Sequence, residues 1–270
     1  MPLAPIATHA RDLWQGALDL VFAPVCVACR EPIDTAESER VVCRLCWLKC
    51  RPLPVTKCPR CWTPLPWDRE IAPSCDTCRP WPASVRAIRS AFAMGEVPRR
   101  LVHALKYRGW EAAAEPMAAR MARMEFPAEV EREASLVVPV PTSAARRRER
   151  GYNQAELLAR AFAARRGLAM DPRLLVRTRA TATQTTLHPN ERRANVARAF
   201  AVPAELAAEV RGEHVLLVDD VWTTGATVLS CAEALLEAGA RVASVATFAR
   251  VVPELERRSA PAPDSLSRLF

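Results

Sequence analysis

Apolar residues follow two different rhythms along this chain. Short, mainly apolar runs with many β-branched residues fall at residues 135–140, 215–218 and 241–248, and the run at 215–218 is entirely apolar. Such runs are typical of strands that are buried on both faces of a parallel sheet. Longer segments repeat apolar residues every three or four positions, which predicts helices at residues 97–107, 110–124, 153–166 and 227–239. Because strands and helices alternate, the pattern predicts an α/β fold with an open, mostly parallel sheet flanked by helices.

The two ends of the chain have patterns of their own. Residues 6–22 carry apolar side chains at helical spacing, so we expect residues 1–22 to contain an amphipathic helix. Residues 251–270 are rich in proline, serine and charge, which is typical of a disordered tail. Short strands are also expected at residues 89–94 and 174–177. A threonine-rich, mobile loop is expected at residues 178–189.

Cysteines are concentrated in the first third of the chain. Eight of the ten cysteines form four CxxC pairs, and 13 residues separate the first pair from the second and the third from the fourth. Two residues between cysteines let both thiolates bind one tetrahedral zinc ion at about 2.3 Å. We therefore predict two structural Cys₄ zinc sites, forming a double zinc ribbon at residues 23–79. The predicted ligands are Cys26, Cys29, Cys43, Cys46, Cys58, Cys61, Cys75 and Cys78.

The sequence leaves two features of this module open. Each ion can be shared by consecutive pairs, or the first pair can join the third and the second pair the fourth. The zinc can simply replace a core too small to fold alone, or the module can also bind nucleic acid or a partner. The two remaining cysteines, Cys50 and Cys231, are predicted to be packing residues.

Two aspartates, Asp219 and Asp220, directly follow the apolar run at residues 215–218. After two more residues comes a loop of small and hydroxyl-bearing residues, namely Thr223, Thr224, Gly225, Ala226 and Thr227. Ligands of open α/β sheets bind beyond the carboxyl ends of the strands. The loop places N–H groups and hydroxyls at a helix N-terminus, where anions bind. Since carboxylates suit ribose hydroxyls or Mg²⁺, the combination predicts a site for a sugar phosphate.

Positive charge is localised in the middle of the chain. Residues 141–200 hold thirteen arginines against four acids, an excess of nine, while the whole chain has a net charge of +8. The densest run includes Arg148 and Arg150 and follows a predicted strand, at the same edge of the sheet as the aspartates. Lys106 lies in a second basic stretch, at the end of a predicted helix. Because pyrophosphate needs cations and hydrogen-bond donors, Lys106, Arg148 and Arg150 are predicted to bind phosphate.

Composition also bears on the cellular compartment. No apolar run approaches the roughly 18 residues that a membrane span needs. The N-terminus lacks the basic start of a signal peptide, and CxxC pairs in an unexported chain indicate metal binding rather than disulfides. We expect a cytoplasmic protein with no transmembrane segment.

Residues 215–227, VLLVDDVWTTGAT, resemble the 5-phosphoribosyl-1-pyrophosphate (PRPP) binding motif of type I phosphoribosyltransferases. This resemblance implies that Asp219 and Asp220 contact the ribose hydroxyls and serve catalysis, while residues 223–227 hold the 5′-phosphate. Further motifs, KYRG, VPVP and RERGYNQ, occur at residues 106–109, 138–141 and 148–154. Together with the four CxxC pairs, they make the chain similar, over about residues 20–250, to the ComF family of competence-associated, phosphoribosyltransferase-like proteins.

The family resemblance implies a double zinc ribbon fused to a phosphoribosyltransferase-like domain at residues 84–250. It also implies a role in DNA uptake during natural transformation, in which the protein handles internalised single-stranded DNA beside the competence helicase machinery. Two functions fit the sequence. One is a Mg²⁺-dependent transferase acting on PRPP with an unspecified acceptor. The other is a non-catalytic protein that senses PRPP or a related ribose phosphate and binds nucleic acid. Its bases would stack on tryptophans that lie among Arg and Lys residues, unless these tryptophans pack against the zinc sites. The tryptophans are Trp47, Trp62, Trp67, Trp81 and Trp110.

Overall fold

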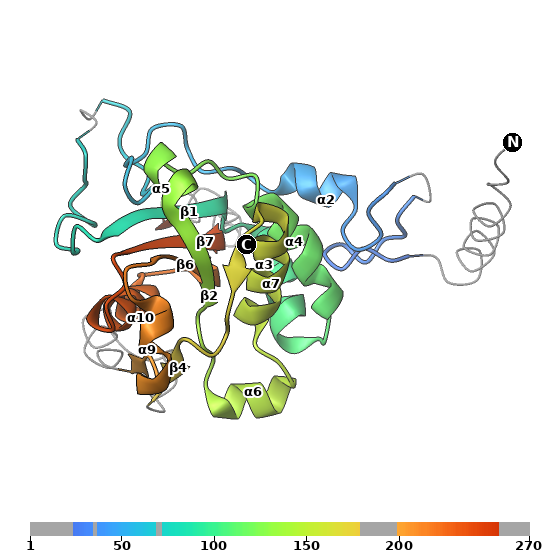
Figure 1. Cartoon of the computed structure of the whole chain (residues 1–270). Coiled ribbons are helices and arrows are strands. Elements are labelled where there is room, and N and C mark those ends of the chain that lie inside the picture. Colours follow the sequence, from blue (N-terminus) through green and yellow to red (C-terminus); the bar gives the residue numbers. More distant parts are fainter. Residues whose placement is uncertain (1–23, 35–36, 69–71, 179–198, 254–270) are drawn as a thin grey trace, which may run out of the picture.

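The computed structural model describes residues 24–34, 37–68, 72–178 and 199–253. Its centre is a five-stranded parallel sheet with the strand order β1-β7-β6-β2-β3 (Figure 1). The strands are β1 (Val85–Ala93), β2 (Ala134–Pro139), β3 (Ala169–Met170), β6 (His214–Trp222) and β7 (Val242–Arg250). Two short strands, β4 (Val176–Arg177) and β5 (Phe200–Ala201), form a separate antiparallel pair. The predicted open, mostly parallel sheet is confirmed.

Helices cover both faces of this sheet. One face carries α3 (Glu96–Tyr107), α4 (Ala114–Met121) and α7 (Gln154–Arg166), and the other carries α10 (Ala226–Glu237) (Figure 1). The shorter elements are α2 (Arg44–Lys49), α5 (Ala128–Glu133), α6 (Ala144–Arg150), α9 (Ala207–Val210) and the 3-10 turns η1 (Glu111–Ala113) and η2 (Ala204–Leu206). None of the described helices combines the length and apolar character that crossing a bilayer requires.

Several segments differ from the sequence-based expectation. The strand expected at residues 89–94 is β1, which begins at Val85, and α2, α5, α9 and β3 were not expected. The single helix expected at residues 110–124 is instead η1 followed by α4, which ends at Met121, and Trp110 precedes it with a non-helical backbone (φ −82°, ψ 63°). The basic run, for which no element was expected, forms α6. The Ser143 hydroxyl accepts a hydrogen bond from the Arg146 N–H (3.3 Å), and Gly151 ends the helix at φ 84°. Since α6 buries none of its residues, it has no apolar period to reveal it.

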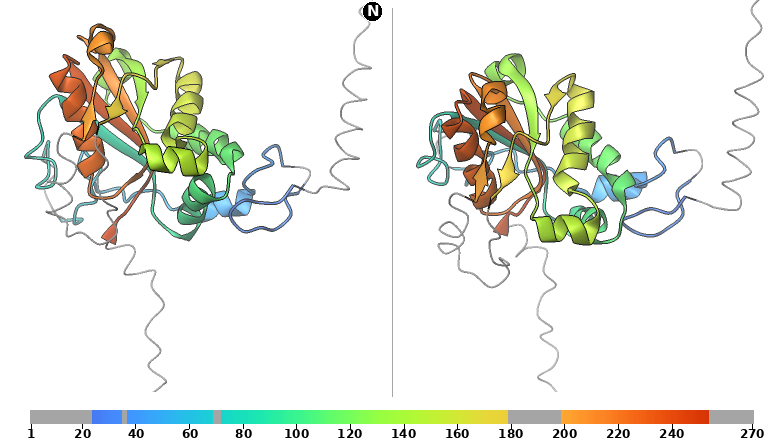
Figure 2. Two further views of the ribbon diagram at one scale, coloured as in Figure 1. Left: turned by 90° about the horizontal axis from the view of Figure 1, so that it is seen from below. Right: turned by 60° about the horizontal axis from the view of Figure 1, so that its bottom comes forward.

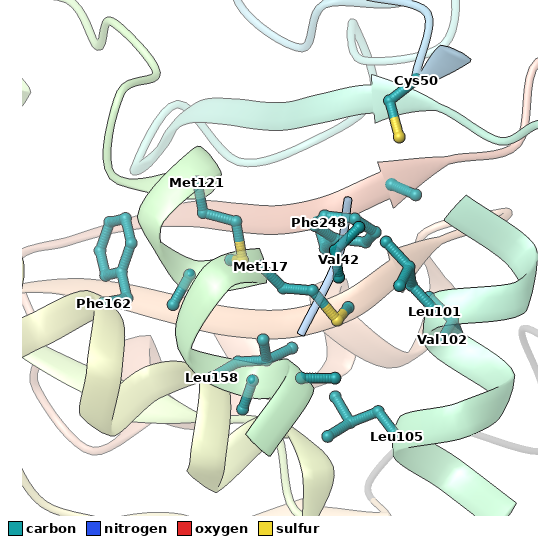
Figure 3. Packing of buried hydrophobic residues seen from close by; sticks show 14 of the residues in the cluster. Val42, Cys50, Leu101, Val102, Leu105, Met117, Met121, Leu158, Phe162 and Phe248 are labelled. Atoms are coloured by element: carbon teal, nitrogen blue, oxygen red, sulfur yellow. The ribbon is translucent and has the colours of Figure 1, made fainter. Parts of the chain in front are cut away.

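The sheet separates two hydrophobic cores. Leu216 and Val218 of β6 pack on the side of α3, α4 and α7, while Val215 and Leu217 pack on the side of α10. This alternation follows from the two-residue period of a strand. Figure 3 shows the first core around Phe248 of β7, with labelled side chains from α3, α4 and α7, namely Leu101, Val102, Leu105, Met117, Met121, Leu158 and Phe162.

The two cysteine-rich segments belong to different cores. The cysteines of the first two CxxC pairs pack with α3, α4 and α7, whereas those of the last two pairs pack with Trp222 and α10. In Figures 1 and 2 the blue segment accordingly lies beside α3 and α4, and the cyan segment runs past the other side of the sheet. Val42 and Cys50 of the first segment point into the core of Figure 3. Each predicted zinc site is thus built into the core of the sheet domain.

The chain from Arg51 to Arg60, which leads into the second cysteine cluster, covers an edge of the sheet. β1 is the outermost strand, and its Ile88 and Ala93 N–H groups donate to the carbonyl oxygens of Arg60 and Arg51, both at 2.9 Å. A covered edge is protected from pairing with another chain. The predicted helix in residues 1–22, the tail beyond residue 253 and all but the first residue of the loop at 178–189 lie outside the described residues.

Candidate functional site

Asp219 and Asp220 lie at the carboxyl end of β6, and each reaches a different helix layer. Asp220, which is 3% exposed, faces α3, where Lys106 Nζ lies 2.5 Å from its Oδ2. Asp219 lies toward α10, close enough that its charge adds to burial in raising the pKa of the Cys231 thiol. The Asp220 N–H donates to Asp219 Oδ1 at 2.8 Å, which fixes the first carboxylate against the strand end.

The electrostatics of this cluster are those of two acids sharing one cation. Burial and repulsion from Asp220 raise the pKa of Asp219 well above its usual range. Burial by itself would lower the pKa of Lys106, but the attraction of Asp220 and Asp219 outweighs it and raises that pKa. Lys106 therefore stays charged, and when both aspartates are ionised the cluster keeps one negative charge that Lys106 does not offset.

The loop after β6 turns sharply at Gly225. Its φ is 80°, and a Cβ added there would lie 2.2 Å from Cζ2 of Trp222, so only glycine fits. Gly225 is also the N-cap of α10, and the Ala226 N–H approaches Thr224 Oγ1 at 3.5 Å. Thr223 and Thr224 are exposed. The predicted loop thus presents hydroxyls and N–H groups at the start of a three-turn helix, beside the acidic pair.

Trp222 connects this loop to the second cysteine cluster. Its ring lies 5.7 Å from that of Trp81 between centroids, and the Arg250 guanidinium lies 5.0 Å from it on another side. Arg250 Nη1 in turn donates to the carbonyl oxygen of Cys61. The sequence motif contained Trp222, but nothing in it indicated that this side chain would join the loop to a metal site.

The predicted phosphate-binding cations lie in three different settings. Lys106 is brought to the aspartates, as described. Arg150 donates from Nη1 to Gln154 Oε1 at 2.9 Å, and its guanidinium lies 4.7 Å from the ring centre of Tyr107. Arg148 lies exposed on α6. The binding roles of all three stay predictions.

Two polar residues that the sequence analysis did not select hold this region together. The Tyr152 hydroxyl donates to the carbonyl oxygen of Leu105 at 2.6 Å, and Asn153 Nδ2 donates to that of Val140 at 3.1 Å. These bonds tie the turn between α6 and α7 to the end of α3 and to β2. Their only signal in the sequence is the motif RERGYNQ at residues 148–154, which contains both residues.

The eight CxxC cysteines form two compact tetrads. In each tetrad the four Sγ atoms lie within 4.8 Å of one another, with separations of 3.7 and 3.8 Å in the first and 3.6, 3.6 and 3.9 Å in the second. A tetrahedral ion with Zn–S bonds of about 2.3 Å requires sulfur atoms about 3.8 Å apart. Both tetrads therefore fit zinc. The members are Cys26, Cys29, Cys43 and Cys46, and Cys58, Cys61, Cys75 and Cys78.

This grouping decides between the two arrangements that the sequence left open. Consecutive pairs share a site, so the cross-braced arrangement is wrong. Cys50 and Cys231 are buried outside both tetrads, which confirms their prediction as packing residues.

Known proteins resemble this chain in sequence. Residues 149–266 match the model of the phosphoribosyl transferase domain. The chain is 33% identical over 243 residues to "DNA utilization protein YhgH" of Salmonella typhimurium, covering 86% of this chain and all of that one. It is 24% identical over 232 residues to "Competence protein ComFC" of Bacillus subtilis (78% and 84% coverage), and 34% identical over 114 residues to "Competence protein F" of Haemophilus influenzae (42% and 49%).

The fold and the sites together define a class. The parallel sheet, the acidic pair and the loop that follows it are those of a phosphoribosyltransferase-type α/β domain, to which two Cys₄ centres suited to zinc are added. The chain belongs to the ComF family.

Proposed function

We propose that the end of β6 and the start of α10 bind PRPP or a related ribose phosphate together with Mg²⁺. The observation that carries this proposal is the direct succession of a carboxylate pair, a left-handed glycine and a helix N-terminus. Asp219 and Asp220 take the ribose hydroxyls and the metal ion. Residues 223–227 hold the 5′-phosphate at the positive end of α10.

The charge of the cluster supports a role for Mg²⁺. Two carboxylates that share one ammonium attract a further cation, and hard oxygen ligands are those that Mg²⁺ prefers. A magnesium ion on Asp220 would compete with Lys106, whose released ammonium could then reach the pyrophosphate. Arg148 and Arg150, on the segment that follows the neighbouring strand β2, would complete the pyrophosphate site.

The proposed biological role is in DNA uptake. Its support is that the curated relatives carry the names "DNA utilization protein" and "Competence protein". We place the protein in the cytoplasm, handling internalised single-stranded DNA beside the competence helicase machinery. Catalytic transfer from PRPP is one form of this function, in which the acidic pair stabilises the oxocarbenium-like ribose.

A non-catalytic form is the second candidate, and exposed aromatic side chains near the site favour it. Tyr107, the last residue of α3, is 59% exposed, and Trp110, just beyond that helix, is 41% exposed. Trp47 and Trp81, in contrast, are buried, with 9% and 7% exposed. Replacing Asp220 with Asn separates the two forms. A transferase should lose turnover, whereas a binding protein should keep its affinity for single-stranded DNA.

A ligand panel tests the proposed site. Unfolding of the zinc-loaded protein would be followed with PRPP, ribose 5-phosphate or pyrophosphate, each with and without Mg²⁺. A ligand at about 100 times its Kd should stabilise the native state by about 2.7 kcal/mol. We expect the largest shift with PRPP and Mg²⁺, and a smaller one with ribose 5-phosphate. Equal shifts with PRPP and pyrophosphate would instead indicate an anion site that does not recognise ribose.

A further inference from the structure

A second concentration of positive charge lies outside the site described above. A cavity of about 470 Å³ is bounded by the first cysteine-rich segment and the exposed face of α3. Its lining includes Arg30, Arg99, Arg100, His103 and Arg108. No carboxylate of the described residues lines it. Cys29 of the first tetrad also lines the cavity, but four arginines outnumber this one thiolate. A hollow with an excess of positive charge concentrates negative ions, so this cavity favours anions.

The arginines of this cavity have different tasks. Arg100 donates from Nη1 to the Ala28 carbonyl oxygen at 3.1 Å and pairs with Glu96 at 2.6 Å, which braces α3 against the first cysteine-rich segment. Arg30 and Arg108 are exposed, and neither forms a salt bridge with an acid within the described ranges. Their charge is therefore available to a ligand.

At the second cysteine cluster, arginines with a structural role are buried and bonded to the backbone. Arg89 is 4% exposed and donates to the carbonyl oxygens of Arg60 and Glu125, each at 3.1 Å. Arg250, also buried, donates to that of Cys61. These guanidinium groups donate their hydrogen bonds to backbone carbonyl oxygens. Arg30 and Arg108 at the first cluster line a hollow instead, where their charge also offsets the excess negative charge of a zinc ion with four thiolates.

An aromatic ring connects the cavity to the region of the ribose-phosphate site. The Tyr107 ring lies 5.0 Å from the His103 ring, which lines the cavity, and 4.7 Å from the Arg150 guanidinium, which belongs to the predicted phosphate site. Tyr107 is 59% exposed and directly follows Lys106. Exposed aromatic rings beside a basic groove are where unpaired bases stack. The cavity and this ring thus offer the two contacts that a single strand needs.

We propose that this cavity binds backbone phosphates of a single-stranded nucleic acid, with one base stacked on Tyr107. It is a second anion site, separated from the acidic pair by the C-terminal end of α3. A strand held here passes close to the ribose-phosphate site. The inference rests on the proposed role in DNA handling, but it does not depend on the binding of PRPP.

The test uses the zinc-loaded full chain and a fluorescently labelled oligothymidylate of about 15 nucleotides, a length within the range that single-strand modules cover. Affinity is measured by anisotropy over a series of salt concentrations for the wild type, Arg30→Gln/Arg108→Gln and the control Arg132→Gln. Arg132 is exposed on α5, away from the cavity, so its replacement removes charge without touching the cavity.

We expect the double variant to bind more weakly and with a lower salt dependence. Each phosphate contact to a single strand contributes about 0.7 to the slope of log K against log salt, so two lost contacts should lower the slope by about 1.4. Tyr107→Ala should weaken binding about tenfold and leave the slope unchanged, because stacking releases no counterions. The control should match the wild type.

Several results would overturn the proposal. If the wild type binds no oligonucleotide, the role in DNA handling fails with it. If the wild type binds but the double variant equals the control, only the cavity is refuted. If inorganic polyphosphate displaces the DNA completely and Tyr107→Ala has no effect, the cavity holds phosphate without recognising nucleic acid. Zinc content is assayed for every variant. If the double variant loses zinc, the single variant Arg108→Gln replaces it in the test, and its slope of log K against log salt should be lower than that of the wild type by about 0.7.

Discussion

The acidic pair of the proposed ligand site lowers the stability of the folded protein. Asp219 and Asp220 are adjacent at a buried strand end, and among the described residues Lys106 is the one cation that forms a salt bridge with this pair, through Asp220. Burial and repulsion raise the pKa of Asp219, which means that ionising it works against folding. Such strain is expected where a fold keeps charge ready for a ligand rather than for its own stability.

Replacing Asp219 with Asn should therefore stabilise the protein at neutral pH, by about 1 kcal/mol. The folded state raises the pKa of Asp219, so the folded protein favours the protonated carboxyl. The free energy of unfolding is therefore not reduced by Asp219 below its unfolded pKa of about 3.9, and it falls as the pH rises toward and through the raised pKa of the folded state. Asn keeps the acceptor for the Asp220 N–H and carries no charge. Urea unfolding as a function of pH should show the gap between variant and wild type widening with pH. A variant less stable than the wild type at neutral pH would contradict this account.

The sequence predicted individual residues well where their chemistry is local. The acidic pair, the following loop and the CxxC pairs depend on neighbours a few positions away, so their pattern is legible in a single chain. The contact between Lys106 and Asp220 is different, since it joins α3 to β6 across the fold. Lys106 was predicted to bind phosphate, and nothing local indicated that it would first meet an aspartate.

At the level of elements, the turn from β6 into α10 depends on one close approach. Gly225 adopts φ 80° directly against the Trp222 ring, and that ring is held by Trp81 and Arg250. The conformation of the loop therefore depends on the packed side chains of Trp222 and Trp81. This packing holds the turn between the acidic pair of β6 and the first residue of α10 in place.

Gly225→Ala should disrupt this turn in two ways. Alanine at this φ costs about 1–2 kcal/mol, and the overlap with Trp222 should add about 1–3 kcal/mol. Gly212→Ala is a matched control, because Gly212 has φ 79° and nothing within 4 Å of an added Cβ. Denaturant unfolding should show a larger loss for Gly225→Ala than for Gly212→Ala, and only the former should reduce ribose-phosphate binding. Equal losses would mean that the Trp222 contact does not shape the loop.

Long elements with a buried face were predictable, and short helices such as α2, α5, α6 and α9 were not. The strands and the longer helices carry apolar periods, which correspond to β2, β6, β7, α3, α7 and α10. α6 has no buried residue, so its helical form follows only from the Ser143 cap and the Gly151 stop. Capping residues are weak signals when no amphipathic pattern accompanies them.

On the scale of the whole molecule, the two cysteine tetrads are part of the main fold. Each tetrad packs into a different core, so the two sites lie on opposite sides of one sheet. The sequence predicted both tetrads but could not place them, because CxxC spacing specifies only local geometry. Their position depends on contacts such as the donation from Arg250 to Cys61, between residues far apart in the chain.

Losing either metal should have different consequences at the ligand site. Cys78→Ser removes a ligand of the second tetrad, which supports Trp222, whereas Cys46→Ser removes the equivalent ligand of the first. Structural zinc stabilises small metal sites by about 10 kcal/mol or more, so both variants should be destabilised. Hydrogen exchange at residues 223–227 should increase more in Cys78→Ser than in Cys46→Ser. The same increase in both variants would argue against a specific link between the second site and the loop.

The most direct test of the central claim is a calorimetric titration of the zinc-loaded protein with PRPP. The wild type and Asp219→Asn/Asp220→Asn would each be titrated with and without Mg²⁺. The account predicts binding to the wild type that Mg²⁺ strengthens and that the double variant loses while remaining folded. A folded wild type that binds no PRPP, or a double variant that binds as well as the wild type, would show that the acidic pair and its loop are not a ribose-phosphate site.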